Sequence, residues 1–394
     1  MSTDKKQVLF VDDDVKLLQG LGRMLRPMRK VWNMEFAYGG PAGIEEIRSR
    51  QYDVVVSDMR MPEISGVDLL KEVSHHCPDS VRVVLSGEAK QDSVYQVLKY
   101  AHQYIAKPCD AQGLQKKVQL ACDARDLLEQ SVLKHSICNI SVLGSSAQYY
   151  DELLEALAEE EPSLRKVSMI IASDLAMTVK VLQFANSAFF GGNNKVLDVF
   201  AATKILGIEV IRELCTRGHI VKSQHEELRE NRGRLLNYQS LIVAKLAHAI
   251  ALEENLSEKE AAQAYTAGLL HNLGLHILAQ VDGRSLQEIL DYSTRNNCWL
   301  SSAEVEVLGL NSTQLGAALL TLWGIPRSLS YLVENYNDAP VLERAEFDVL
   351  SCVYCAFHFC YGKENSLSDD EYLKSFGKEH KVPQWINLLA DVLH

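Results

Sequence analysis

Strand-like apolar runs alternate with helical patterns through the first 110 residues, and this alternation limits the fold more than any other feature of the chain. The runs are QVLFVD (7–12), a weaker stretch at 34–38, YDVVVSD (52–58), VRVVLSG (81–87) and QYIAKP (103–108). Unbroken apolar runs of this length are typical of parallel strands that are buried on both faces. The helical patterns between them would return the chain to the start of the next strand. The first half is therefore predicted to be an α/β domain with a doubly wound, five-stranded parallel sheet.

Acidic and polar residues stand where these strands end. Asp12 and Asp13 follow the first run, Asp58 ends the third, and Ser86 and Lys107 end the last two. Ligands of doubly wound sheets bind at the carboxyl ends of the strands, so we expect these side chains to converge. Three carboxylates at one point repel each other unless a cation lies among them, and hard oxygen ligands suit Mg²⁺. One carboxylate could then attack a phosphoryl donor and form an acyl phosphate, while the hydroxyl and the ammonium bind the phosphoryl oxygens.

Four motifs in this half occur in order and at suitable spacing: VDDD, SDMRMPEISGVDLL, LSGE and YIAKP. Together they resemble the receiver domain of two-component response regulators. The resemblance implies that Asp58 is the phosphoacceptor and that its phosphate comes from a sensor histidine kinase or a phosphotransfer protein. It further implies that Asp12, Asp13, Asp58 and the Arg60 backbone carbonyl hold Mg²⁺. Lys107 would contact the phosphoryl group, and Ser86 would supply a hydroxyl in place of the commoner threonine. Tyr104 would be the aromatic residue that moves in the switch.

The pattern becomes helical after the receiver-like residues 1–124. Seven positions from Leu114 to His135 step alternately by four and three residues, a heptad-like seam that Arg125 and His135 weaken. The seam fits either a last domain helix that extends into a linker over residues 125–140 or a coil that joins two chains in a homodimer. No convincing strand follows residue 140. Residues 141–394 are therefore predicted to form an all-α, HD-like helical domain with a C-terminal helical extension.

One stretch of the second half, AYTAGLLHNLG (264–274), raises the question of catalysis. In a metal-dependent phosphohydrolase of the His-Asp type, the residue after His271 would be an aspartate that bridges two metal ions, but here it is Asn272. An amide carries no charge and is a poor substitute for that carboxylate. The other ligand positions of such a centre are also occupied by residues of the wrong type: Tyr238 and Gln239, Asn311 and Ser312, and Asn335 and Tyr336. We therefore expect no di-metal site; His248 and His276, the remaining candidates, are more simply explained as structural histidines.

The stretches around these positions resemble the HDOD family, whose members keep the HD scaffold without its catalytic ligands. They are residues 174–191, 199–214, 264–278 and 315–326, of which LQFANSAFFG within the first is the most specific. The chain departs from the family pattern at Asp174, which is not followed by the usual proline. The resemblance implies a regulatory module with no cofactor of its own. Asn186 and Ser187 are expected to cap or brace helices, and Phe189 and Phe190 to pack in the core.

Charge and composition limit the classes of partner that we expect for this chain. Residues 1–125 hold 18 Lys and Arg against 17 Asp and Glu, whereas the remainder holds 22 against 35. An acidic half repels phosphate backbones, so nucleic acid is not an expected partner. No uninterrupted apolar stretch reaches the length of a membrane helix, and three aspartates end the first apolar run, so we expect a cytoplasmic protein without a membrane partner. The Cys352–Cys355 pair lies in a helical apolar run, and packing explains it more simply than metal or redox chemistry.

These observations predict a response regulator in which Asp58 accepts phosphate and a non-catalytic helical domain signals through contacts with an unidentified protein. Beyond the receiver's own phosphorylation and dephosphorylation, no enzymatic activity is expected. Two alternatives stay open. The helical domain could be a degenerate HD-type phosphohydrolase or nucleotide-binding regulator linked to cyclic-di-GMP turnover, or the receiver could serve as a phosphate sink beside an inert domain.

Overall fold

The computed structural model describes residues 5–87, 91–129, 131–191, 195–223, 227–342, 345–361 and 371–393. Its first part is a parallel sheet with the strand order β2-β1-β3-β4-β5, which confirms the predicted doubly wound fold. The strands are β1 (Lys6–Asp12), β2 (Trp32–Tyr38), β3 (Val54–Asp58), β4 (Val81–Ser86) and β5 (Gln103–Ala106). The central strands β1, β3 and β4 are almost wholly buried, as their unbroken apolar sequences require.

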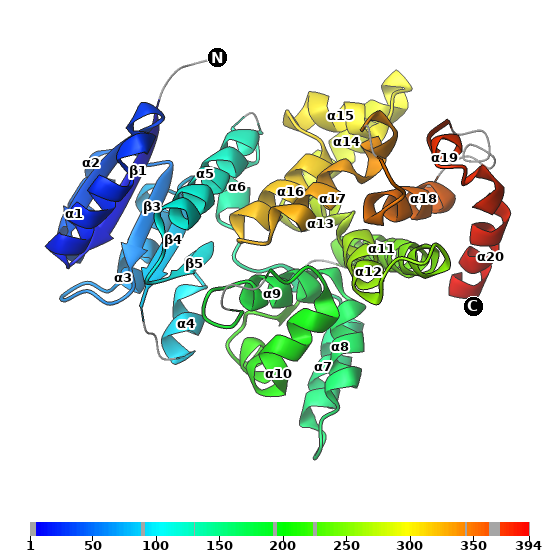
Figure 1. Ribbon diagram of the computed structural model, residues 1–394, viewed down its shortest axis with the longest axis horizontal. Helices are drawn as coiled ribbons and strands as arrows, with labels where there is room; N and C mark the ends of the chain where they lie inside the picture. Colours follow the sequence, from blue (N-terminus) through cyan, green and yellow to red (C-terminus); the bar gives the residue numbers. More distant parts are fainter. Residues whose placement is uncertain are drawn as a thin grey trace.

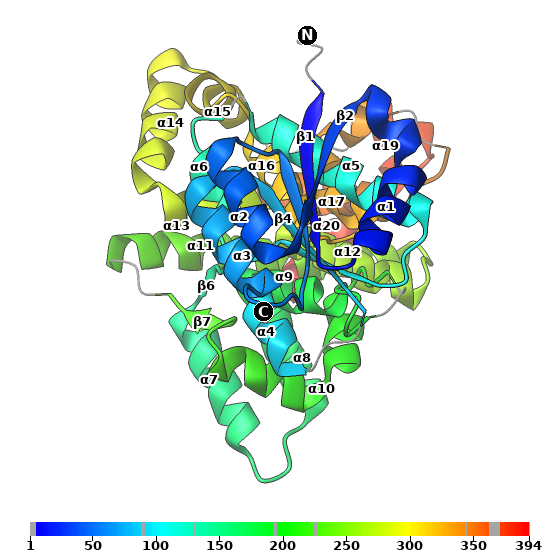
Figure 2. The same cartoon turned by 90° about the vertical axis from the view of Figure 1, so that its left-hand side faces the viewer.

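Helices cover both faces of this sheet. Figure 2 shows α1 and α5 on one side and α2, α3 and α4 on the other. Their bounds are α1 (Val15–Met24), α2 (Gly39–Ser49), α3 (Gly66–His76), α4 (Gln91–Val97) and α5 (Ala111–Leu128), with a 3-10 turn η1 (Arg26–Lys30) after α1. Side chains at the starts of α1, α3 and α5, Asp14, Ser65 and Asp110, accept hydrogen bonds from backbone N–H groups of the first turn. These caps fix where each helix leaves the carboxyl edge of the sheet.

The predicted linker helix is shorter than expected. The helix α5 ends at Leu128, and a separate short helix, α6 (Lys134–Cys138), follows it. The seam positions Leu114, Val118, Ala121 and Leu128 are fully buried because α5 packs against the chain's own sheet and against α16. Val132, beyond the end of α5, is 71% exposed. The apolar seam is therefore filled within one chain and is not free to form a coiled coil.

The rest of the chain is helical and lies beside and below the receiver-like part (Figure 1). Its main helices are α7 (Ala147–Ala158), α8 (Leu164–Ala172), α9 (Leu175–Ala185), α10 (Val199–Thr216), α11 (Glu227–Glu253), α12 (Glu258–Leu270), α13 (Leu273–Val281), α14 (Gly283–Asn296), α15 (Leu300–Leu308), α16 (Ser312–Leu322), α17 (Arg327–Asn335), α18 (Val349–Tyr361), α19 (Glu371–Ser375) and α20 (Val382–Leu393), with 3-10 turns η2 (Tyr336–Val341) and η3 (Glu379–Lys381). One departure from the prediction is a two-residue parallel pairing of β6 (Gly144–Ser145) with β7 (Val221–Lys222). Strands this short carry no periodic pattern, so the sequence could not indicate them.

The apolar pattern of residues 258–280 by itself predicts a single helix, but the chain breaks there into α12 and α13 at His271 and Asn272. The break lets α13 approach the start of α16 very closely, since a Cβ added to Gly274 would lie 1.9 Å from the backbone oxygen of Ser312. Only glycine permits this contact, which explains the glycine of the HNLG motif.

The helix α11 runs through the helical domain. By length and composition its Gly233–Glu253 part is the one helix of the described chain that could cross a membrane, and 44% of that part is buried within the fold. It packs along α12 and α18, and core helices show the same composition.

Candidate functional site

The side chains of Asp12, Asp58 and Lys107 lie close together at the carboxyl edge of the sheet. The Nζ atom of Lys107 lies 2.6 Å from Oδ2 of Asp12 and 2.5 Å from Oδ1 of Asp58, so one ammonium joins the ends of β1 and β3. The backbone N–H of Lys107 donates to the carbonyl of Ser86 at 2.7 Å, which fixes the chain after β5 beside the end of β4. Asp13 follows Asp12 at the same edge and is half-buried.

Backbone contacts hold Asp58 in place. Its Oδ2 atom accepts a hydrogen bond from the backbone N–H of Arg60 at 2.6 Å. The chain then returns so closely that a Cβ on Gly66 would lie 2.0 Å from the carbonyl oxygen of Asp58. The glycine of the SDMRMPEISGVDLL motif is therefore required for the loop that positions Asp58. The role expected of the Arg60 carbonyl stays a prediction.

Burial and charge act against each other at this edge. Burial raises the pKa of Asp58, and the hydrogen bond and charge of Lys107 reduce that rise without cancelling it. Burial lowers the pKa of Lys107, but its hydrogen bonds to Asp12 and Asp58 outweigh this effect and leave that pKa raised. The lysine therefore remains an ammonium at neutral pH and offsets one of the neighbouring carboxylate charges.

The donor set fits Mg²⁺. Within the described ranges, no three His, Cys, Asp or Glu side chains are grouped closely enough to hold a metal ion by themselves. Mg²⁺ needs no such group, because it keeps several waters and binds through one or two carboxylates. The carboxylates of Asp12, Asp13 and Asp58 supply hard oxygen atoms at this edge, and they are the residues that would hold the ion.

The two residues expected to respond to phosphorylation are both buried. Ser86 is 3% exposed and Tyr104 is 4% exposed. The carbonyl of Tyr104 accepts a hydrogen bond from the backbone N–H of Ala188 in the helical domain at 3.4 Å. Gln103, beside it on β5, donates to the carbonyl of Thr321 at 3.1 Å. Tyr104 therefore lies against the second domain. Glu88 of the LSGE motif lies outside the described residues.

An aromatic cluster joins the two domains, and no pattern in the sequence indicates it. Tyr95 of α4 is 1% exposed, and its ring centroid lies 6.0 Å from those of Phe184 and Phe190. Nε2 of His219 donates a hydrogen bond to the carbonyl of Tyr95 at 2.9 Å, and the guanidinium of Arg217 lies 4.9 Å from the Tyr95 ring. Phe190, expected in the core of the helical domain, thus packs against the receiver-like part. Contacts between residues so distant in sequence leave no periodic pattern.

Asn186 and Ser187, next to this cluster, brace the chain as expected. The side-chain amide of Asn186 donates to the carbonyls of Leu182 and Val196, and its oxygen accepts from the N–H of Val196. The hydroxyl of Ser187 donates to the carbonyl of Phe184 at 2.6 Å. Both residues therefore brace the turn after α9, which carries Ala188 and Phe190 to the receiver-like part.

His271 lies in a tightly packed aromatic environment. Its Nδ1 atom is 2.6 Å from the carbonyl of Gly268, so Nδ1 carries the proton, and Nε2 has no partner among the described groups. The rings of Tyr336, Phe357 and Tyr361 lie at centroid distances of 5.3, 5.6 and 6.0 Å. Burial lowers the pKa of His271 to about 4, so the imidazole is neutral at pH 7.

The other positions where an HD centre would place ligands are satisfied locally. Asn311 accepts from the N–H of Gln314 and forms a capping box at the start of α16, and the amide of Asn335 donates to the carbonyl of Tyr331. Tyr238 is 57% exposed on α11. Of these positions, only Tyr336 has its ring against His271.

A second buried cation, Lys180, lies near the domain contact. Its ammonium donates to the carbonyl of Ser141 at 2.6 Å and to Oε1 of Gln183 at 2.7 Å, and it lies 4.1 Å from the Trp323 ring. No carboxylate of the described chain pairs with it, and burial lowers its pKa to about 7. Between that value and about 10.5, the ordinary pKa of lysine, the unfolded chain therefore binds one more proton than the folded chain, and stability rises with pH.

We expect Lys180→Met to flatten this pH dependence. From pH 7 to pH 10 the free energy of unfolding should rise less steeply in the variant, by up to about 1.4 kcal/mol per pH unit. Urea unfolding at several pH values measures the slope, with Lys204→Met, at an exposed lysine of α10, as the control. Equal slopes in Lys180→Met and the unsubstituted protein would show that Lys180 does not titrate in this range.

Comparison with known proteins identifies two matching families. The model of the HDOD domain matches residues 143–339, and that of the response regulator receiver domain matches residues 8–119. An uncharacterized protein of Treponema pallidum is 24% identical over 194 residues, 48% of this chain and 36% of that protein. The transcriptional regulatory protein ZraR of Klebsiella oxytoca is 28% identical over 147 residues, 37% of this chain and 33% of that protein. The chain thus spans about a third of the length of these curated relatives.

Two solved structures are also similar to parts of this chain. The signal receiver domain of an HD domain-containing protein from Pseudomonas fluorescens is 24% identical, covers 31% of this chain and 98% of its own, and has a TM-score of 0.30. The MmoQ response regulator of Methylococcus capsulatus is 19% identical, covers 63% of this chain and 98% of its own, and has a TM-score of 0.47.

Proposed function

The chain belongs to the HDOD domain family and carries a response regulator receiver domain ahead of its HDOD domain, and on this premise we propose that it is a regulator controlled by phosphorylation of Asp58. The observation that supports this most directly is the position of Lys107, whose ammonium lies within hydrogen-bonding distance of both Asp12 and Asp58. A buried carboxylate beside a fixed cation at a strand end is suited to receive a phosphoryl group.

In the proposed reaction an Oδ atom of Asp58 attacks phosphorus, and the bond from phosphorus to the donor breaks. The donor leaves with that electron pair. The leaving group is the histidine of a sensor kinase or phosphotransfer protein, or acetate when acetyl phosphate is the donor. In this proposal Lys107 exchanges its bond to Asp58 for one to a phosphoryl oxygen, and the hydroxyl of Ser86 donates a hydrogen bond to another. Bound Mg²⁺, held by Asp12, Asp13 and Asp58, would neutralise charge on the phosphoryl oxygens.

The output is proposed to be non-enzymatic and to act through contacts with another protein. Three rings fill the space beside His271, and Asn272 hydrogen-bonds Tyr361 rather than offering a carboxylate, which supports a scaffold without metal catalysis. The acidic composition of this half favours a protein surface over a nucleic acid. We propose a cytoplasmic regulator without a membrane partner, and we leave open a homodimer through another surface.

A pull-down from native lysate tests this output. We expect a protein that is captured by the phosphorylated chain and lost with Asp58→Asn, because the proposed contact depends on phosphorylation of Asp58. The comparison is matched, since both proteins carry the same HDOD surface. Identical captures would contradict phosphorylation control.

The unpartnered Nε2 atom of His271 is the observation that favours the second candidate, a degenerate phosphohydrolase or nucleotide-binding regulator linked to cyclic-di-GMP turnover. Stoichiometric transition metal in the purified protein, or turnover of a cyclic dinucleotide that His271→Ala abolishes, would favour this candidate instead.

A further inference from the structure

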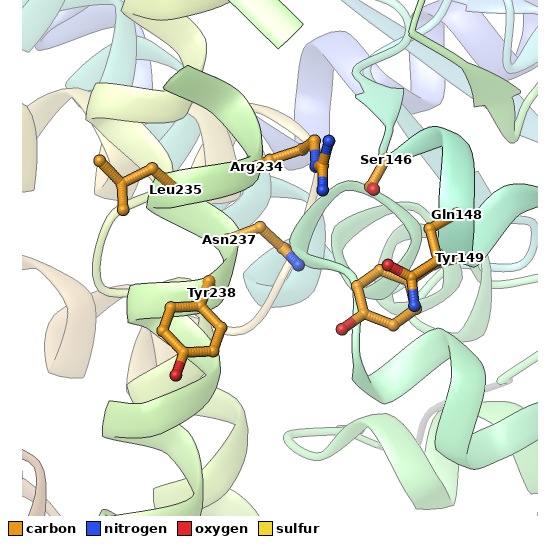
Figure 3. A pocket seen from close by; sticks show the side chains of 7 residues that line it. All are labelled: Ser146, Gln148, Tyr149, Arg234, Leu235, Asn237 and Tyr238. Atoms are coloured by element: carbon orange, nitrogen blue, oxygen red, sulfur yellow. The ribbon is translucent and has the colours of Figure 1, made fainter. Parts of the chain in front are cut away.

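A pocket lies in the HDOD domain between the start of α7 and the first half of α11 (Figure 3). Neither His271 nor Asp12, Asp58 or Lys107 lines it. Its volume is about 370 Å³, and seven residues line it: Ser146, Gln148, Tyr149, Arg234, Leu235, Asn237 and Tyr238. Small-molecule sites have volumes of about 300–1,000 Å³, so this one is large enough for a ligand of modest size. The family matches assign no role to it.

The charge of the pocket favours an anion. Arg234 is its one charged lining residue, and within the described part of the chain its guanidinium has neither an ion pair nor a hydrogen bond. An unpaired guanidinium is notable in a half of the chain where acidic residues outnumber basic ones by 35 to 22. Its planar set of N–H donors matches a phosphate or carboxylate group.

Further donors lie on the opposite wall. Ser146 precedes α7 but makes no capping bond with its side chain, so its hydroxyl is not used to close the helix. The first N–H groups of a helix have no partners within it. Asn237, by contrast, is committed to the fold: its oxygen accepts from the N–H of Leu175, and its nitrogen donates to the carbonyl of Ser173. The side-chain amide of Gln148 donates to Oε1 of Glu152 at 3.0 Å, so ligand recognition falls to Arg234 and Ser146.

Two aromatic rings flank the same space. Tyr238 projects from α11 and Tyr149 from α7, on opposite sides of the pocket in Figure 3. Tyr238 is 57% exposed, and no described ring packs against either tyrosine. Tyr149 is half-buried, so one ring is exposed and the other is held by the fold. Rings that line a cavity suit a planar ligand, because base-on-ring stacking stabilises binding and tolerates different bases.

We propose that this pocket binds a mononucleotide, with the phosphate on Arg234 and the base between Tyr149 and Tyr238. The size favours this class, because the volume is near the lower end of the range for ligand sites and a cyclic dinucleotide needs considerably more room. The proposal does not depend on phosphorylation of Asp58.

The pocket is linked to the domain contact through the fold. The N–H of Ser146 donates to Oδ2 of Asp174, whose other oxygen caps α9, the helix that carries Phe184 to Tyr95. Ser145, just before the pocket, pairs with Lys222 shortly after Arg217 and His219. A bound ligand would therefore order the segments that contact the receiver.

Calorimetric titration of the full chain with AMP, GMP, CMP and UMP tests the proposal. We expect at least one to bind, and we expect Arg234→Gln and Tyr238→Ala each to weaken it about tenfold or more. Arg165→Gln, at an exposed arginine of α8 outside the pocket, should bind as the unsubstituted protein does. Arg234→Gln should still be phosphorylated at Asp58, which separates this proposal from the phosphoacceptor assignment.

Three results would overturn the proposal: no binding of any of the four nucleotides, unchanged affinity in Arg234→Gln, or inorganic phosphate binding as tightly as the best nucleotide. Tighter binding of cyclic di-GMP than of any mononucleotide would overturn the size argument and with it the proposed ligand class.

Discussion

Asp58→Asn is expected to abolish phosphorylation of the chain completely. The amide is a far weaker nucleophile than the carboxylate, and no other carboxylate receives both a hydrogen bond from Lys107 and one from the N–H of Arg60 within the described residues. A phosphate-affinity gel of protein treated with acetyl phosphate and Mg²⁺ shows the result as loss of the retarded band. The fold should survive, because Lys107 keeps its contact with Asp12.

Asp123→Asn is a suitable control, since Asp123 is an exposed carboxylate of α5 that accepts a hydrogen bond from Gln119 and none from Lys107. It should be retarded as the unsubstituted protein is. Circular dichroism of Asp58→Asn checks that any loss of the band is not caused by unfolding. A retarded band of full strength in well-folded Asp58→Asn would place the phosphate on another residue.

The cluster of Asp12, Asp58 and Lys107 at the carboxyl edge of the sheet could be predicted from the sequence because it depends on local patterns. Each apolar run ends in a polar residue, and a parallel sheet brings those ends to one edge, so Asp12, Asp58 and Lys107 had to meet. The close approach of Gly66 to the carbonyl of Asp58 adds a detail that the pattern alone does not contain.

The helical half was predictable in its helices but not in their ends. The apolar pattern of residues 258–280 continues across His271 and Asn272, whereas the helix breaks there and Gly274 packs against the backbone of Ser312. That partner lies 38 residues further along the chain, beyond the reach of a periodicity argument. The contact of Tyr95 with Phe184 and Phe190 could not be predicted for the same reason, since the sequence pattern of each domain does not indicate contacts with the other domain.

This domain contact bears on the proposed response to phosphorylation. The Tyr104 carbonyl and the Gln103 side chain both bond to the helical domain, so a receiver that moves Tyr104 must first disturb these bonds. Two kinds of interaction hold the contact. Arg217 pairs with Asp92 at 2.5 Å in a partly exposed position, and Tyr95 inserts its whole ring among Phe184, Phe190 and His219.

The two interactions differ greatly in strength. An exposed ion pair contributes about 0–1 kcal/mol and weakens in salt, whereas removal of a buried aromatic ring costs about 3–5 kcal/mol. Tyr95→Ala is therefore expected to open the contact, and Arg217→Ala or high salt is expected to change it little. Hydrogen exchange should become faster in residues 183–191 and 217–220 of Tyr95→Ala, because Tyr95 covers these segments.

The same variant should also accept phosphate from acetyl phosphate faster, since the bonds that hold Tyr104 against Ala188 no longer oppose its movement. Tyr38→Ala is the matched control, because Tyr38 is an exposed tyrosine at the far edge of the same sheet and contacts neither segment. Circular dichroism shows whether each variant keeps its helices and sheet. If exchange in both segments is as slow in folded Tyr95→Ala as in the unsubstituted protein, the aromatic cluster does not hold the domains together, and the polar bonds of Gln103 and Arg217 must do so instead.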